Sequence, residues 1–395
     1  MNKAELCNII RSKYPKAFGI RKRLQQIKVQ RLHNHFLTEA EILACEKDPA
    51  EKKRIVAARA EEWKSNLRPI VAEMEEILEK SAAYRDRENL DDIRTDILYC
   101  RMAFGFLPSE YLGFELENRS KEERLKFESD IDTFEFGYSV NDITKLQSIV
   151  DKGESFKQFK QYFGRDAMLI DKRANFEEFR TFVQKHPKFV KKKTNSAQGK
   201  NIELIDFPTL GKTDREYFDT LVSSGKFLLE ELVVQHAEMA KFNASSVNTI
   251  RCMTMNTKNE GVVVPYCFMR TGRNGSFVDN GGSGGILIGV DAKTGVVNTD
   301  GYDEYMARFE EHPDTHIHFL GSQIPAWDDM LNFCKEAAAK VEGMGYLSWD
   351  MAYTDKGWVV IEVNGIGQLI GPQIVMKRGI KAEVAELLAK MNTVV

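Results

Sequence analysis

The strongest constraint on the fold is a hairpin pattern near the C-terminus. Two strand-like runs, Tyr346–Tyr353 (YLSWDMAY) and Trp358–Asn364 (WVVIEVN), flank the short turn Asp355-Lys356-Gly357. A three-residue hairpin loop usually ends on a left-handed residue, ideally glycine. With Gly357 in that place, we expect Thr354 to pair with Trp358, and this pairing sets the register of the two strands.

Three oxygen-bearing side chains converge in this register. Asp350 lies directly opposite Glu362, and Asn364, two residues further along, shares the same sheet face. Unpaired carboxylates inside apolar strands are too costly to leave without partners. Oxygen ligands of this kind suit Mg²⁺, which completes its shell with water and substrate phosphates. The alternative is that these are simply solvent-facing polar residues of two strands. This alternative explains any one of the three side chains, but it explains all three in register less well.

Composition limits the class of protein. The 395 residues allow two to three domains, and 43% hydrophobic with 29% charged residues is ordinary for a soluble globular chain. A net charge of −3 gives no electrostatic case for a nucleic acid or an anionic membrane as main partner. Six cysteines without a CxxC pattern indicate reduced thiols. The N-terminus lacks a signal-peptide core and no long apolar run is present, so we expect a cytoplasmic protein without membrane insertion.

Residues 1–110 are predicted to form an N-terminal helical region. Asp48 and Pro49 are typical of a helix start, and apolar residues then recur at three- and four-residue spacing. Pro69 indicates the start of a second helix, and Leu90–Phe104 a third. The apolar stripe serves as core or as a surface for a partner, so a homo-oligomer or another partner through these helices stays open.

From about residue 156 the pattern alternates between helix and strand. Several strands adjoin short loops, which predicts an α+β fold of mostly antiparallel sheets with helices on one face. Beyond the helical region we expect a linker and first segment (111–185), a small subdomain (186–240) and a larger C-terminal subdomain with the metal site (241–395). The predicted helices are Phe156–Phe163, Phe176–Lys185, Asp214–Ser223, Asp328–Gly343 and Ala382–Met391.

The segment Lys188–Ile205 (KFVKKKTNSAQGKNIELI) brings strand lysines beside a loop of small polar residues. Backbone amides in such a loop and a neighbouring lysine can bind phosphate. The residue order of a Walker A motif is absent. A solvated lysine run beside a hairpin is the alternative.

Two further strands are candidates for contact with a nucleotide. Phe227–Met239 (FLLEELVVQHAEM) ends a buried strand in paired glutamates, which could offer backbone groups to adenine and a carboxylate to ribose. An edge strand with exposed glutamates explains this segment equally well. In Ser246–Met255, strand alternation places Arg251 on one face with Thr249 and Met253. Phosphate and a cross-strand carboxylate are both suitable partners for that arginine.

Asp279–Gly289 (DNGGSGGILIG) is the most glycine-dense segment of the chain. Its glycines enter a strand rather than a helix, which argues against a Rossmann phosphate loop. We interpret Asn280, Gly281 and Gly282 as part of a mobile substrate or phosphate loop, with a structural turn as the alternative.

In this order the motifs resemble the ATP-grasp superfamily, most closely its sugar-transfer-associated branch. The resemblance spans about residues 90–375 and rests on IVDKGESFKQFKQYFGR, FLLEELVVQH, SVNTIR, DNGGSGGI and WVVIEVNG. It implies ATP held between two α+β subdomains and Mg²⁺ held by acidic strand residues. It also implies that an acid is phosphorylated to an acylphosphate, which an amine or similar nucleophile then attacks.

The resemblance implies roles for individual residues in nucleotide binding. The candidates are Lys152, Lys192, Glu230, Glu231, Val233 and Glu238. The two lysines would contact the phosphates, Glu231 and Val233 would meet adenine through backbone groups, and Glu230 or Glu238 would lie near the ribose. Lys192-Lys193 replaces the usual Lys-Pro, so Lys191 remains an alternative to Lys192.

The remaining implied roles are catalytic and metal-binding. Arg251, with Lys192, would stabilise charge on the γ-phosphate and the acylphosphate, and Asp350, Glu362 and Asn364 would hold Mg²⁺. We therefore expect an ADP-forming carboxylate–amine ligase that uses ATP and Mg²⁺ in cell-surface polysaccharide or sugar-conjugate biosynthesis. Its partners would be a small-molecule carboxylate and an amine or sugar-linked acceptor. A small-molecule kinase and a non-catalytic nucleotide-binding scaffold are the alternatives.

Overall fold

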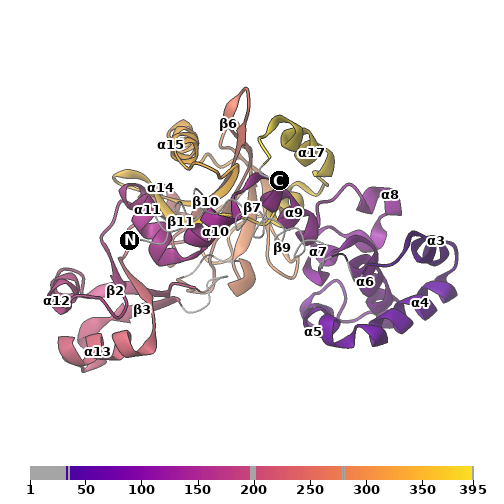
Figure 1. The fold of residues 1–395 in the computed structure, drawn as a ribbon, viewed down its shortest axis with the longest axis horizontal. Helices are drawn as coiled ribbons and strands as arrows, with labels where there is room; N and C mark the ends of the chain where they lie inside the picture. The colour runs from indigo at the N-terminus through magenta and orange to yellow at the C-terminus, as the bar shows by residue number, and fades with distance from the viewer. Residues whose placement is uncertain (1–32, 34–35, 196–201, 278, 280, 394–395) are drawn as a thin grey trace, which may run out of the picture.

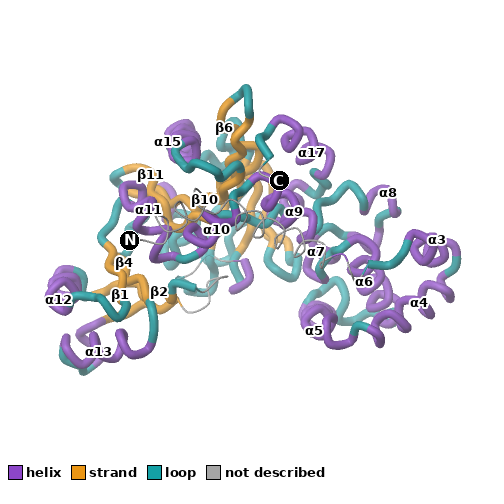
Figure 2. The backbone as a smooth tube through the Cα atoms, viewed as in Figure 1, coloured by secondary structure: helices purple, strands orange, loops and turns teal. Residues whose placement is uncertain are grey.

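The computed structural model describes residues 33, 36–195, 202–277, 279 and 281–393. Asn280 and the loop Gln198-Gly199-Lys200 lie outside this described part. The chain is arranged as a helical region, a small sheet unit and a large sheet unit (Figure 1). Figure 2 shows strands in the two sheet units and only helices and loops in the helical region, at the right of the view.

The helical region begins with helices whose starts follow from local capping. Asp48 caps α4, because its side chain accepts a hydrogen bond from the backbone N–H of Ala50, and Pro49 is the first helical residue. The break between α4 and α5 falls at Trp63, earlier than predicted, and Pro69 lies inside α5. The predicted bounds of α6 are confirmed. The helices are α3 (Glu39–Lys47), α4 (Pro49–Glu62), α5 (Lys64–Lys80), α6 (Leu90–Phe104), α7 (Pro108–Gly113), η1 (Leu116–Asn118) and α8 (Lys121–Arg124).

The core of the helical region continues past residue 110, where we expected the region to end. Tyr111, Phe114 and Phe127 are buried in the same cluster as the residues of α5 and α6. Ile374, from the C-terminal part of the chain, joins this cluster. The helices therefore pack against the large sheet unit and share a core with it.

The small sheet unit is antiparallel, with the strand order β1-β4-β2-β3. Its core contains Phe179, Phe189 and Leu229, all fully buried. Strand β1 and helix α12 belong to this unit, so it begins before the predicted boundary at residue 186. Its elements are β1 (Ala167–Ile170), α12 (Phe176–Lys185), β2 (Lys188–Lys193), β3 (Ile202–Asp206), η2 (Phe207–Leu210), α13 (Asp214–Ser224) and β4 (Phe227–Glu231).

The large unit is built on an antiparallel sheet of order β11-β10-β5-β6-β7-β8-β9. The antiparallel α+β prediction is confirmed, but helices cover both faces rather than one. The reason lies in β5, where Ile250 and Cys252 face the α15 side and Met253 and Met255 face the α16 and α17 side, all of them buried. The strands are β5 (Thr249–Thr257), β6 (Gly261–Thr271), β7 (Ile286–Val290), β8 (Val297–Tyr302), β9 (Arg308–Phe309), β10 (Tyr346–Thr354) and β11 (Gly357–Asn364).

The helices of the large unit include one that adjoins both sheets. Phe156 and Phe159 of α11 are buried in the core of the large unit, and the start of α11 approaches β1 of the small sheet. Gly153 permits this approach, because a Cβ atom there would lie 2.6 Å from Cδ1 of Leu169. The helices are α9 (Asp130–Val140), α10 (Ile143–Val150), α11 (Lys152–Phe163), α14 (Ala237–Ala240), η3 (Gly281–Ser283), α15 (Trp327–Ala339), α16 (Ile370–Met376) and α17 (Lys381–Lys390).

Candidate active site

The β10–β11 hairpin places Asp350 directly opposite Glu362, as the sequence predicts. The turn itself differs from the prediction, since Thr354 pairs with Gly357 instead of Trp358. A register shift next to Asp350 then adds one residue on β11 and restores the expected pairing. The two carboxylates therefore share one face of the large sheet.

Asn364 extends this polar face by one more position. It lies opposite Ser348, which precedes Asp350 by two residues on β10. Among the described residues, neither Nδ2 of Asn364 nor Oγ of Ser348 has a hydrogen-bond partner, although both atoms are buried. Buried polar atoms are nearly always paired, so two orphans beside opposed carboxylates indicate a place where a polar ligand belongs.

Two arginines hold Asp350. Arg251 on β5 lies directly opposite Asp350 on β10 and forms a two-point ion pair with it, including a 2.8 Å contact from Nη2 to Oδ2. Nη2 of Arg270 lies 2.9 Å from the same oxygen. Burial alone would raise the pKa of Asp350, but the two guanidinium groups outweigh it and hold this pKa below its usual value. Asp350 is thus a buried, ionised carboxylate.

Arg270 was not among the predicted site residues, although the argument applied to Arg251 also fits it. Both arginines lie inside strands, and both need partners there. Arg270 donates to Thr249 at 2.9 Å and lies 3.6 Å from Asp279, while Thr249 also bonds Asp279. Burial raises the pKa of Asp279 despite the attraction of Arg270. This network attaches the start of the glycine-dense segment to the site.

The first two glycines of that segment lie two and three residues after Asp279. Gly281 and Gly282 lie in η3, and Asn280 is outside the described residues. Nε of Arg273 donates to the carbonyl oxygen of Gly284 at 2.8 Å, which fixes the far end of the segment. The segment is therefore anchored at both ends beside the polar face of the sheet.

Lys152 joins α11 to the hairpin. Its Nζ lies 2.6 Å from Oε1 of Glu362, and only 11% of its side chain is exposed. Asp151 caps α11 by accepting hydrogen bonds from the N–H groups of Gly153 and Glu154, which fixes the backbone next to Lys152. The backbone N–H of Lys152 donates to the carbonyl oxygen of Thr194, at the end of β2. Lys152 thus lies where the two sheet units meet.

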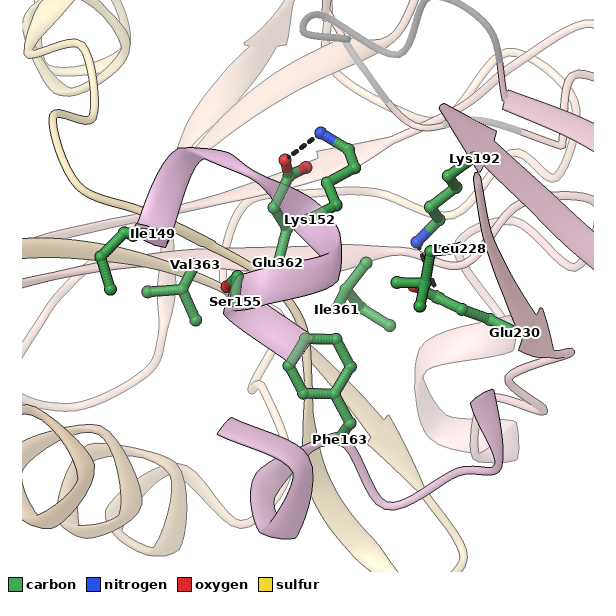
Figure 3. A pocket seen from close by; sticks show the side chains of 10 residues that line it. All are labelled: Ile149, Lys152, Ser155, Phe163, Lys192, Leu228, Glu230, Ile361, Glu362 and Val363. Carbon is green, nitrogen blue, oxygen red and sulfur yellow. Dashed lines mark hydrogen bonds and ion pairs between the residues drawn. The ribbon is translucent and has the colours of Figure 1, made fainter. Parts of the chain in front are cut away.

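A small cavity lies between the two sheet units at this point (Figure 3). Lys152 and Glu362 line one side, and Lys192, Leu228 and Glu230 line the other. Its volume is about 10 Å³, space for about one water molecule.

Lys192, and not Lys191, faces this cavity. Nζ of Lys192 lies 2.8 Å from Oε2 of Glu230, and both side chains are buried. Lys191 points to β3 instead, where it pairs with Glu203 at 2.8 Å. The alternation of side chains along β2 thus separates the two lysines that the sequence left open.

Glu230 is bound from two sides. Lys192 and Arg165 both contact Oε2, and the pair with Arg165 measures 2.7 Å. Burial raises the pKa of Glu230, but these two cations outweigh it and lower the pKa below the usual value. Arg165 also donates to the carbonyl oxygen of Val360 at 2.6 Å, so it connects the small sheet to β11. Its partners come from distant segments, so no local pattern marks Arg165 as a site residue.

The other predicted nucleotide contacts lie around the end of β4. The backbone N–H of Glu231 already donates to the carbonyl oxygen of Asp166, and its side chain accepts from the N–H of Asp166. Val233 follows β4, and Glu238 is exposed on α14 beside Lys241. The structure thus brings Lys152, Lys192 and Glu230 together with the hairpin residues, and leaves Glu238 at the surface.

A family model for sugar-transfer associated ATP-grasp proteins matches residues 133–388, well over half of the chain. The chain belongs to this family. The match contains both sheet units and every candidate site residue, while most of the helical region lies before it. A search of curated proteins finds no match. Among the described residues, no helix combines the length and apolar character needed to cross a membrane.

Several solved structures are similar to this sugar-transfer-associated ATP-grasp protein over part of its length. The ATP-grasp ligase PsnB, complexed with a minimal precursor, is 12% identical with a TM-score of 0.39. The match covers 62% of this chain and 62% of PsnB. The D-alanine-D-alanine ligase from Coxiella burnetii is 9% identical, with 69% and 66% coverage and a TM-score of 0.37. N5-carboxyaminoimidazole ribonucleotide synthetase from Thermotoga maritima is 12% identical, with 62% and 50% coverage and a TM-score of 0.35.

Proposed function

We propose that this protein is an ATP- and Mg²⁺-dependent ligase, which activates a carboxylate as an acylphosphate and joins it to an amine or similar nucleophile. The observation that carries the proposal is the charged face of the β10–β11 hairpin. This face lies opposite Lys192 across the small cavity between the two sheet units. Membership of the ATP-grasp family supports it. A role in cell-surface polysaccharide or sugar-conjugate biosynthesis is part of the same proposal.

Lys152 and Lys192 are the proposed phosphate contacts. Both lysines are paired with carboxylates in this structure, at 2.6 and 2.8 Å, so their charges are already oriented into the cavity. Triphosphate oxygens would take the place of these carboxylates. We propose that Glu230, bound by Arg165 and buried, positions Lys192, and that Glu231, Val233 and Glu238 lie around the base and ribose.

Asp350, Glu362 and Asn364 fit Mg²⁺ as a donor set. All three carry oxygen atoms on one face, Asp350 is ionised, and the amide nitrogen of Asn364 is buried without a partner among the described residues. Glu362 is the most accessible of them, with 35% of its side chain exposed. When bound there, Mg²⁺ would neutralise charge on the phosphate oxygens of ATP.

Arg251 and Arg270 would stabilise charge in the two chemical steps. In the first, an oxygen of the substrate carboxylate bonds to the γ-phosphorus, the bond to the β–γ bridging oxygen breaks, and ADP leaves. In the second, the amine nitrogen bonds to the acyl carbon, phosphate leaves with the electron pair of the C–O bond, and the amine proton passes to solvent. Fixed guanidinium groups suit both steps, because negative charge is redistributed among oxygens.

Release of ADP and phosphate tests the proposal. Pools of small carboxylic acids and amines are incubated with the protein, ATP and Mg²⁺, separately and together. A ligase releases ADP and phosphate only when both pools are present. A stable phosphorylated product with one pool alone would instead establish a kinase, and nucleotide binding without turnover in any pool would establish a scaffold.

A further inference from the structure

A second cavity lies between the helical region and the far edge of the large sheet. Its volume is about 370 Å³, within the range of small-molecule sites. Tyr84 and Arg87 line it from the helical side, and Tyr302 and Arg308 line it from β8 and β9. In the sheet order, β8 and β9 lie at the opposite edge from β11, so this cavity is separate from the candidate active site.

Backbone strain is concentrated at this cavity. Of the six non-glycine residues with positive φ in the described part of the chain, three line it. They are Glu115 (φ 55°), Met306 (φ 63°) and Lys377 (φ 53°). Glycine would adopt these angles without strain. The chain therefore retains three non-glycine residues at a backbone cost around one cavity, and strained residues of this kind cluster at ligand sites.

The charges around the cavity are already compensated. Arg87 pairs with Glu117 at 2.5 Å, Lys377 pairs with Glu115 at 2.7 Å, and Arg308 contacts Asp300 at 2.6 Å. Because each cation has a carboxylate partner, an anionic ligand finds no excess positive charge. A hydroxyl group both donates and accepts hydrogen bonds, so it can bind a cation and its carboxylate partner together.

Aromatic side chains complete the lining. Tyr302 presents a ring with Nζ of Lys377 4.2 Å from its centroid, and Tyr84 is buried at the cavity wall. Lys377 covers one face of Tyr302 and Tyr84 is only 3% exposed, so the two tyrosines form the wall of the cavity, and the ion pairs would bind the hydroxyl groups of a ligand. Asn118 adds an exposed amide with both donor and acceptor atoms.

We propose that this cavity binds a neutral carbohydrate of one or two rings. The binding site needs both the helical region and the ATP-grasp domain, and it does not depend on the proposed ligase chemistry. The proposal gives the helical region a function. A sugar bound in this cavity would contact both the helical region and the edge of the large sheet farthest from the β10–β11 hairpin.

Saturation-transfer NMR on the full chain tests this proposal. The probes are glucose, galactose, N-acetylglucosamine and maltose at millimolar concentration, with glucose 6-phosphate as the charged comparison. We expect saturable transfer to at least one neutral sugar, weakened about tenfold by Arg87→Gln and by Asn118→Ala. Arg94→Gln is the matched control, because Arg94 forms a two-point pair with Glu75 in the same helical region outside the cavity.

Lys377→Gly gives an independent second test. Glycine relieves the backbone strain at this position, so we expect an unchanged or higher Tm. The variant also lacks the lysine side chain, so we expect weaker sugar binding. The proposal is overturned if no neutral sugar shows saturable transfer, if Arg94→Gln weakens binding as much as the cavity variants, or if glucose 6-phosphate binds more tightly than every neutral probe. Asn118→Ala keeps the test decisive if Arg87→Gln fails to fold.

Discussion

Lys152 and Glu362 form an ion pair of 2.6 Å between the start of α11 and the β10–β11 hairpin. The lysine is a candidate phosphate ligand, and the glutamate is a candidate metal ligand. In this structure the two charges neutralise each other. Binding of a magnesium nucleotide would separate them, with Mg²⁺ replacing Lys152 at the carboxylate and phosphate replacing Glu362 at the lysine.

Lys152→Met therefore has opposite effects on two ligands. Without Lys152, Glu362 lacks its ammonium partner, so we expect Mg²⁺ alone to raise the Tm more than in the wild type. Affinity for an ATP analogue should fall about tenfold, because a charge-assisted phosphate contact is lost. Lys157→Met, on the same helix and paired with Glu154, is the control and should change neither property. Equal Mg²⁺ shifts in Lys152→Met and wild type would contradict this exchange of partners.

Lys192 and Lys191 are adjacent and should differ sharply in nucleotide binding. Lys192 faces the cavity between the two sheet units and pairs with buried Glu230, whereas Lys191 pairs with Glu203 on β3. We expect Lys192→Met to weaken binding of an ATP analogue about tenfold, and Lys191→Met to leave it nearly unchanged. Calorimetric titration of both variants measures this. A larger loss of affinity in Lys191→Met than in Lys192→Met would show that the nucleotide binds at the other face of the small sheet.

Asn364→Leu should stabilise the unliganded chain while impairing ligand binding. The buried amide nitrogen of Asn364 has no partner among the described residues, so replacing it with an apolar group of similar shape removes a desolvation cost of about 1 kcal/mol. Mg²⁺-dependent nucleotide binding should weaken. Urea unfolding and calorimetry measure the two effects, with Asn298→Leu at an exposed position of β8 as control. A loss of stability in Asn364→Leu would mean that the amide is paired in solution.

Glu128 should make stability depend on pH. Burial, helped by the charge of Asp132, raises the pKa of Glu128 from 4.5 to about 8. Between these values the folded chain keeps a proton that the unfolded chain releases, so the free energy of unfolding falls as pH rises. The total loss is on the order of a few kcal/mol.

Glu128→Gln isolates this effect. The variant should lose this part of the pH dependence and be more stable than the wild type above the folded-state pKa. Thermal unfolding across this pH range measures the difference, and Glu386→Gln on the exposed face of α17 is the control. Parallel Tm curves for Glu128→Gln and the wild type would exclude a buried, protonated Glu128.

The hairpin illustrates what local sequence determines. Alternation and the turn residues predict the facing of Asp350 and Glu362, and this pairing is confirmed. The predicted route was wrong, because the tighter turn at Gly357 is offset by the irregularity beside Asp350. A one-residue bulge leaves no mark on the hydrophobic pattern. β10 is buried on both faces from Tyr346 to Ala352, so its apolar pattern is compatible with either register.

The two arginines that were not predicted, Arg165 and Arg270, have acidic partners in distant segments. The bounds of α6 follow from its own periodicity and were predicted correctly. Arg165 and Arg270 gain their roles from Glu230 and Asp350, more than 60 residues away in each case. Which of Lys191 and Lys192 faces the cavity likewise depends on which face of β2 lies against it. The packing of the small sheet against α11 sets this face.

Calorimetric binding of a non-hydrolysable ATP analogue, with and without Mg²⁺, tests the central claim most directly. We predict that the wild type binds the analogue more tightly with Mg²⁺, and that Glu362→Gln, which keeps the shape but not the charge of the side chain, loses this dependence on Mg²⁺. Absence of binding to the wild type at millimolar analogue, or an equal effect of Mg²⁺ on Glu362→Gln, would contradict the nucleotide and metal site described for the β10–β11 hairpin.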